Sequence, residues 1–153
     1  MSVRIAETPF EPAHELAVFA RGRADVGGIA SFVGLVRGEH AGERVLAMTL
    51  EHYPGMTERQ LERIAAEARA RWPLQDLLIV HRVGRMLPGE PIVLVATASA
   101  HRAAALEACA FLIDWLKTKA PFWKLEETPA GERWVEARAE DDAAAARWQR
   151  AAE

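Results

Sequence analysis

The sequence of 153 residues has little cysteine, little lysine and no long apolar run. Cys109 is its only cysteine, which excludes an internal disulfide and a cysteine-rich metal site. No apolar run approaches the roughly eighteen residues of a membrane span, and no charged segment followed by an apolar one resembles a signal peptide. We therefore expect a cytoplasmic protein with no membrane partner.

Other familiar signals are missing as well. The net charge is −3 with both signs mixed along the chain, so no basic surface for nucleic acid is expected. There is no glycine-rich phosphate loop, no HExxH and no GxSxG motif. We predict neither a cofactor nor a bound metal, and any site for an anion must be local.

Lysine is scarce except in one segment. All three lysines lie in "KTKAPFWK" at 117–124, whereas the other sixteen basic residues are arginines. A lysine amine can lose its proton when it is desolvated, and an arginine guanidinium cannot. Unlike the sixteen arginines, the lysines of this segment could therefore also serve as an acid or base.

Half of the residues are hydrophobic, which is enough for a core in one domain spanning 1–153. Hydrophobic periodicity and turn residues predict the elements in chain order. Strands are expected at 3–6, 27–37, 45–53, 76–84 and 91–100, helices at 14–22, at 57–72 and between Ser99 and Pro121, then a hairpin within 122–138 and a terminal helix at 140–153. We expect the strands at 27–37 and 45–53 to pair antiparallel. Antiparallel neighbours with interspersed helices indicate the α+β class.

Lys117 occupies an unusual place in the helix before Pro121. Helical spacing puts it on an apolar stripe that also holds Leu106, Ala110 and Ile113. It could be a lysine whose stem covers the core while its amine reaches the last carbonyls, or an amine held in a partly dry pocket with a lowered pKa. Lys124 could point to the same place. Lys119 is about 200° away around the helix and is expected to serve the helix dipole or solvent.

The segment "SAHRA" at 99–103 places His101 and Arg102 in the first turn of the same helix. Cations are disfavoured there unless an anion compensates them, and free backbone N–H groups add to a possible phosphate site. A surface pair without a ligand is the alternative. Arg37, at the end of a predicted strand, is a third candidate donor.

The remaining candidates are expected to be structural. His52 lies in a turn, His81 lies inside a strand, and Cys109 fits a small buried hydrophobe in a helix. The residues alone therefore predict a compact α+β domain with a cationic, lysine-containing pocket for an anionic ligand.

Five segments carry a further signal when they are taken together: "LEHYPGM" (50–56), "RWPL" (71–74), "SAHR" (99–102), "LKTKAPFWK" (116–124) and "RWVEAR" (133–138). In this order they resemble one known family, the large, catalytic subunit of molybdopterin synthase. The resemblance runs from the strand at 27–37 to Trp148, and residues 1–25 match weakly. It implies an α/β hammerhead-type α+β fold with a mainly antiparallel sheet. It also implies a homodimer flanked by two small ubiquitin-like sulfur-carrier subunits in a heterotetramer.

The implied reaction is a sulfur transfer in molybdenum cofactor biosynthesis. Each carrier inserts a C-terminal Gly-Gly tail that ends as a thiocarboxylate, and two sulfurs pass to cyclic pyranopterin monophosphate to form the dithiolene. The resemblance assigns the catalytic lysines to Lys117 and Lys124. It assigns anion binding to Arg37, His101, Arg102 and Arg138, and it implies that one pocket uses residues from both subunits of the dimer.

Without the resemblance, the residues are also compatible with two other functions. A Schiff-base lyase would also need a desolvated lysine beside a phosphate site, and borohydride trapping would reveal its imine. A non-enzymatic adaptor that only binds a ubiquitin-like tail would form no product.

Overall fold

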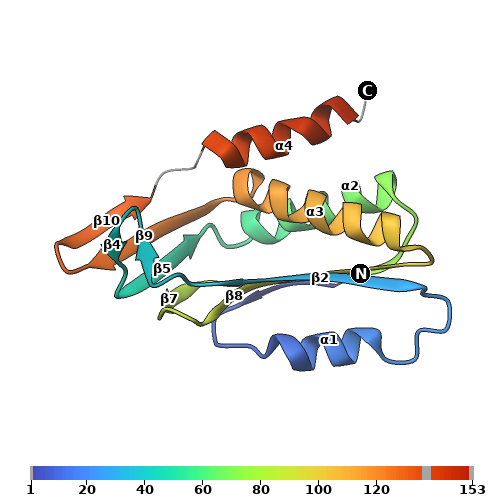
Figure 1. The fold of residues 1–153 in the computed structure, drawn as a ribbon, viewed down its shortest axis with the longest axis horizontal. Coiled ribbons are helices and arrows are strands. Elements are labelled where there is room, and N and C mark those ends of the chain that lie inside the picture. The colour runs from blue at the N-terminus through green and yellow to red at the C-terminus, as the bar shows by residue number, and fades with distance from the viewer. Residues whose placement is uncertain (1, 136–138, 152–153) are drawn as a thin grey trace.

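A four-stranded sheet forms the centre of the computed structural model, which describes residues 2–135 and 139–151 (Figure 1). Its strands, in spatial order, are β1 (Ser2–Ala6), β6 (Leu74–Arg82), β8 (Pro91–Ser99) and β2 (Gly28–Leu35). The β1–β6 pair is parallel, and the other two pairs are antiparallel. β2 is therefore an edge strand of this sheet.

Helices cover both faces of the central sheet (Figure 1). α1 (Pro12–Ala20) lies on one face, and α2 (Met56–Arg71) and α3 (Arg102–Lys119) lie on the other. α4 (Ala139–Ala151) packs over α3. The core between the sheet and α2 and α3 contains Leu61, Ile64, Leu77, Ile79, Val95, Phe111 and Leu112. A second core beneath α1 contains Phe10, Phe19, Leu78, Val80 and Leu94.

A second four-stranded sheet stands at the end of the molecule where β2 and α3 finish (Figure 1). Its spatial order is β10 (Gly131–Val135), β9 (Phe122–Thr128), β5 (Ala47–His52) and β7 (Gly84–Met86). All of its pairs are antiparallel. A small hairpin of β3 (Glu39–His40) and β4 (Glu43–Arg44) joins the two sheets in sequence.

Most predicted elements are confirmed, but one predicted strand pair is wrong. The α+β class, the helix near 57–72 and the late hairpin of β9 and β10 all appear. The segments at 27–37 and 45–53 do not pair with each other, because β2 joins β8 and β5 joins β9 and β7. The chain changes sheets through the β3–β4 hairpin, and β5 then buries Met48 and Leu50 in a separate small core.

The predicted apolar stripe of α3 is only partly buried, because Ile113 packs against the core and Leu106 does not. Periodicity places the stripe of Leu106, Ala110 and Ile113 in the core, yet Leu106 is 60% exposed. The helix instead buries Ala105, Ala108, Cys109, Phe111, Leu112 and Leu116. α3 is apolar on two faces, so periodicity alone could not decide which of them would meet the sheet.

Candidate functional site

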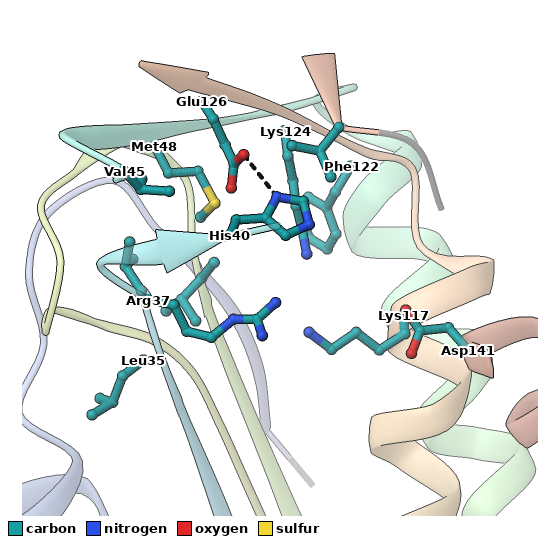
Figure 2. Close-up of a pocket in the computed structure, with 13 residues that line it drawn as sticks. Leu35, Arg37, His40, Val45, Met48, Lys117, Phe122, Lys124, Glu126 and Asp141 are labelled. Atoms are coloured by element: carbon teal, nitrogen blue, oxygen red, sulfur yellow. Dashed lines mark hydrogen bonds and ion pairs between the residues drawn. The ribbon is translucent and has the colours of Figure 1, made fainter. Parts of the chain in front are cut away.

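A pocket lies between the end of β2, the C-terminal end of α3 and strand β9 (Figure 2). Its cavity is about 190 Å³. Arg37 enters two residues after β2, Lys117 comes from the last turns of α3, and Lys124 comes from β9. Pro121 ends α3, so the chain turns directly into β9 and brings both lysines to one cavity.

The three cations converge on the cavity. Figure 2 shows the side chains of Arg37 and Lys117 pointing toward one another across the pocket, with Lys124 directed into the same space. Like charges that share one cavity repel unless anions lie among them, and the carboxylates of Asp141 and Glu126, which also line the pocket, balance only part of this charge. The arrangement is therefore suited to an anionic group, such as a carboxylate, thiocarboxylate or phosphate.

Lys124 has the most altered acid–base chemistry of the pocket. Burial disfavours its charged form, and the neighbouring charges of Lys117 and Arg37 act in the same direction, whereas Asp141 and Glu126 oppose them. Together they lower the pKa of Lys124 from 10.5 to about 8. An amine with this pKa can give or take a proton near neutral pH.

One wall of the pocket is a hydrogen-bonded acid. Glu126 accepts from Nδ1 of His40 at 2.8 Å and from Nε of Arg133 at 3.1 Å. Burial of Glu126 opposes its ionisation, but these two donors outweigh that effect and hold the pKa of its carboxyl below the usual value. Arg133 also donates to Glu43 and to the carbonyl of His40, so it links the β3–β4 hairpin to β10.

His81 lines a smaller adjoining cavity, which Lys117, Lys124 and Phe122 also line. Its ring stacks on Phe122 with the centroids 4.1 Å apart, and its Nδ1 lies 3.1 Å from the carbonyl oxygen of Arg82. Burial, and then the charges of Lys117 and Lys124, lower the pKa of His81 to about 4. The imidazole is therefore neutral near pH 7, with Nδ1 as the donor to the carbonyl.

The sequence predictions did not find several of these residues. His81 was expected to be structural, and nothing marked His40, Glu126 or Asp141 as neighbours of the lysines. The alternation of β9 offers the only local signal, since Phe122, Lys124 and Glu126 occupy the same face of that strand.

His101 and Arg102, two predicted anion-binding residues, lie at the opposite end of α3 from Lys117. Arg102 and Lys117 are fifteen residues apart on one helix, which corresponds to about 22 Å along its axis. Within one chain, these residues and the lysine pocket are therefore separate. Arg138 lies outside the described residues.

The chain's one thiol is remote from this chemistry. Cys109 is buried, and burial raises its pKa to about 11, as expected for a structural cysteine. Among residues 2–135 and 139–151, no group of histidine, cysteine and acidic side chains could hold a metal ion. No helix of that part of the chain is long and apolar enough to cross a membrane.

Comparison with known proteins gives consistent matches. The model of the MoaE protein family matches residues 5–119. The chain is 54% identical over 149 residues to the molybdopterin synthase catalytic subunit of Pseudomonas aeruginosa, covering 97% of this chain and 99% of that protein. The structure is similar to that of the molybdopterin biosynthesis MoaE protein from Burkholderia ambifaria, with a TM-score of 0.82, 54% identity and 97% of each chain covered. It is also similar to molybdopterin synthase from Staphylococcus aureus, with a TM-score of 0.79, 30% identity, and 86% of this chain and 95% of that chain covered.

Proposed function

The chain belongs to the MoaE protein family, and from this membership we propose how its lysine pocket works as the catalytic site of a molybdopterin synthase. The protein acts as the catalytic subunit, an enzyme that transfers sulfur to cyclic pyranopterin monophosphate. The observation that carries the proposal is the convergence of Arg37, Lys117 and the Lys124 amine, whose pKa is about 8, on one cavity.

The sulfur comes from a partner, because this chain has no suitable donor. Its only cysteine is buried, has a raised pKa and does not line the lysine pocket. A small ubiquitin-like carrier with a C-terminal Gly-Gly thiocarboxylate supplies a sulfur that is already anionic. Glycines suit such a tail because a narrow pocket admits bare backbone more readily than side chains.

Lys117 and Arg37 hold the anionic tail, and Lys124 moves protons. The thiocarboxylate sulfur attacks an electrophilic carbon of the pterin side chain, so that a C–S bond forms as a C–O bond breaks. The Lys124 ammonium protonates the departing oxygen. Water then attacks the carbonyl of the resulting thioester and gives a proton to the Lys124 amine. The acyl C–S bond breaks, leaving sulfur on the pterin and a carboxylate on the carrier.

His101 and Arg102 bind the substrate phosphate, together with Arg138. Because α3 separates His101 and Arg102 from Lys117 by about 22 Å, we assign this pair to the pocket of a second copy of the chain. This assignment agrees with the homodimer that the family resemblance implies. Removing Arg102 or His101 should weaken binding of the phosphorylated pterin more than binding of a dephosphorylated analogue, and equal losses would contradict the assignment.

The direct test mixes the protein with a thiocarboxylated carrier and cyclic pyranopterin monophosphate and measures dithiolene formation. Lys124→Arg keeps a cation but cannot exchange its proton near neutral pH, so the rate should fall by about 10²-fold or more. Lys119→Arg is the matched control, because Lys119 lies over the Trp115 ring rather than in the pocket. A Lys124→Arg variant with a normal rate would remove Lys124 from proton transfer.

A Schiff-base mechanism is tested in the same reaction mixture. Borohydride added during turnover should leave the mass of the protein unchanged, since sulfur transfer needs no imine. Deleting the two terminal glycines of the carrier should abolish product.

A further inference from the structure

His81 is a buried titratable group that the proposed reaction does not use. It is 8% exposed and lies near the end of β6 in the central sheet. Its Nδ1 faces the carbonyl oxygen of Arg82, and its ring stacks on Phe122 of β9. These two contacts fix the ring and leave Nε2 as the nitrogen that can serve another purpose.

Nε2 opens on the smaller of the two adjoining cavities. Because Nδ1 carries the proton of the neutral imidazole, Nε2 has a free lone pair and can only accept a hydrogen bond. No described residue bonds to Nε2, and the atom is not completely enclosed by protein. Since His81 lines the smaller cavity, this acceptor faces the space between the ring and the lysines.

Three polar side chains meet in an otherwise apolar cavity. They are His81, Lys117 and Lys124. The rest of the lining is apolar and consists of Leu50, Ile92, Val93, Ile113, Leu116, Ala120 and Phe122. The amines can donate hydrogen bonds and the imidazole nitrogen can accept one, so a small molecule that both donates and accepts can bond to all three.

Water is the molecule that this cavity fits. The volume is about 60 Å³, which is several times the roughly 15 Å³ that one buried water needs and far below the roughly 300 Å³ of a site for an organic ligand. Buried waters make about two to four hydrogen bonds, and the three polar groups can supply that number. No hydrogen bond joins His81 directly to either lysine in the described chain, so a water can bridge them.

The cavity lies beside the place where the proposed reaction consumes water. It shares Ile92, Lys117, Phe122 and Lys124 with the larger cavity, which takes the tail of the carrier in the proposed reaction. A tail that fills the larger cavity excludes bulk water from the reacting carbon. Hydrolysis of the thioester then requires a water that is already inside the protein.

We propose that His81 is a positioning residue, which holds the hydrolytic water between its Nε2 and the two lysine amines. One O–H of the water donates to Nε2, so that an oxygen lone pair faces the thioester carbonyl. The water oxygen bonds to the acyl carbon, and the Lys124 amine takes the proton of the other O–H. The acyl C–S bond then breaks with its electron pair on sulfur. The pterin thiolate takes the remaining proton from the new carboxylic acid, which leaves a carboxylate on the carrier.

The acceptor remains available at the pH at which Lys124 works. Burial is the largest cause that lowers the pKa of His81 to about 4, and the charges of Lys117, Lys124 and His52 act in the same direction, against the bond to the Arg82 carbonyl. A protonated ring would donate from Nε2 instead of accepting there. Above about pH 5 nearly every ring is neutral and can hold the water.

A high-resolution crystal structure of the protein without its carrier tests the water site. An ordered water should lie within about 3.2 Å of Nε2 of His81 and bond to at least one lysine amine. His81→Leu removes the acceptor, and its crystals should lack this water. A direct bond between Nε2 and a lysine amine, or a cavity without ordered water, would overturn the proposal.

Two substitutions distinguish the two nitrogens of His81. A glutamine amide reaches the position of Nε2 and can accept a hydrogen bond there, whereas an asparagine amide reaches only the position of Nδ1 and can keep the bond to Arg82. His81→Asn should therefore slow hydrolysis by about 10²-fold, the loss expected when a reacting group moves by about 1 Å. His81→Gln should keep most of the wild-type rate. A purely structural role of the Nδ1 bond would give the reverse order.

Quenched single-turnover reactions, followed by mass spectrometry, show which step is slowed. The His81→Asn protein should form the C–S bond at the wild-type rate and accumulate the thioester between carrier and pterin. His14→Asn on the exposed face of α1 is the control and should behave as the wild type does. Circular dichroism of each variant detects unfolding. Unchanged hydrolysis in His81→Asn, or equal slowing of both steps, would contradict the role of His81.

The two levels of the inference can fail separately. The water site depends on the cavity and its three polar groups, whereas its use in hydrolysis rests on the proposed function. A wild-type protein that forms no dithiolene would refute the proposed function. The crystal structure would still decide whether His81 and the lysines bind a water.

Discussion

The pKa of Lys124 can be measured directly, because the chain contains only three lysines. Protein labelled with ¹³C at the lysine ε-carbons gives three signals, which single lysine-to-arginine substitutions assign. The Lys124 signal should titrate with a midpoint near pH 8 rather than 10.5. At pH 8 about half of the Lys124 amines would then be neutral, against about 0.3% for an unshifted lysine. The pocket thereby increases the neutral fraction more than a hundredfold.

A variant separates the two main causes of this shift. Burial is the larger cause and the charge of Lys117 is the next. Lys117→Met removes the charge but keeps a long side chain, so the Lys124 midpoint should move upward while remaining below 10.5. Lys119→Met is the control, because Lys119 is not among the residues that shift Lys124.

The same titration predicts the pH dependence of the reaction. Each cycle starts from the Lys124 ammonium, so the rate of dithiolene formation should be level below about pH 8 and fall as the pH rises through that value. A cation contributed by a second copy would lower the midpoint further. A Lys124 signal that titrates near 10.5 would refute the argument that Lys124 is buried beside other cations, and with it the proposed proton transfer.

Three further predictions concern the pocket and the core. The pKa of His81 is about 4 in the folded protein, against an ordinary value of 6.5, so the unfolded chain binds this proton first, and stability should be lost as the pH falls from about 6.5 to 4. In urea unfolding, His81→Gln should remove up to about 3 kcal/mol of this loss in the free energy of unfolding. The control is His14→Gln on the exposed face of α1, which should leave the loss in place. An unchanged loss in His81→Gln would mean that His81 is not buried in its neutral form. Leu112→Ala, at a side chain with no exposed surface, should lower the free energy of unfolding by about 2 to 5 kcal/mol, measured against Leu87→Ala at a 49% exposed position; equal losses would place Leu112 outside the core. Arg133→Ala should loosen the β3–β4 hairpin, seen as faster amide hydrogen exchange at 39–44, and unchanged exchange would show that Arg133 does not fasten it.

Much of the local structure could be predicted from the sequence because its signals are local. The spacing of Leu61, Ile64, Ala65 and Ala68 specified α2, and all four are buried as expected. The turn between 128 and 131 specified the hairpin of β9 and β10. The choice of partner strands was less accessible, because β5 joins β9 and β7 through packing between segments that are far apart in the chain.

The face of α3 shows the same limit. One stripe contains Phe111 and Leu112, another contains Leu106 and Ile113, and either could have met the sheet. Only the packed structure assigns the first to the core and divides the second, with Ile113 packed against the core and Leu106 exposed.

The chemical types at the site follow from the sequence alone. All three lysines lie at 117–124, and the one cysteine lies in an apolar helical segment. These two features indicated a site that uses an amine rather than a thiol. The five segments that resemble the family can also be recognised in the sequence alone.

Which residues meet at the site depends on the tertiary structure. Folding brings Arg37 to Lys117 and Lys124, sets His81 in the adjoining cavity, and joins Glu126 to His40. It also separates Arg102 from Lys117 by the length of a helix. The physical reason is that residue type and periodicity act over a few neighbouring residues, whereas burial, and the pKa that burial sets for Lys124, depends on every segment packed around the site.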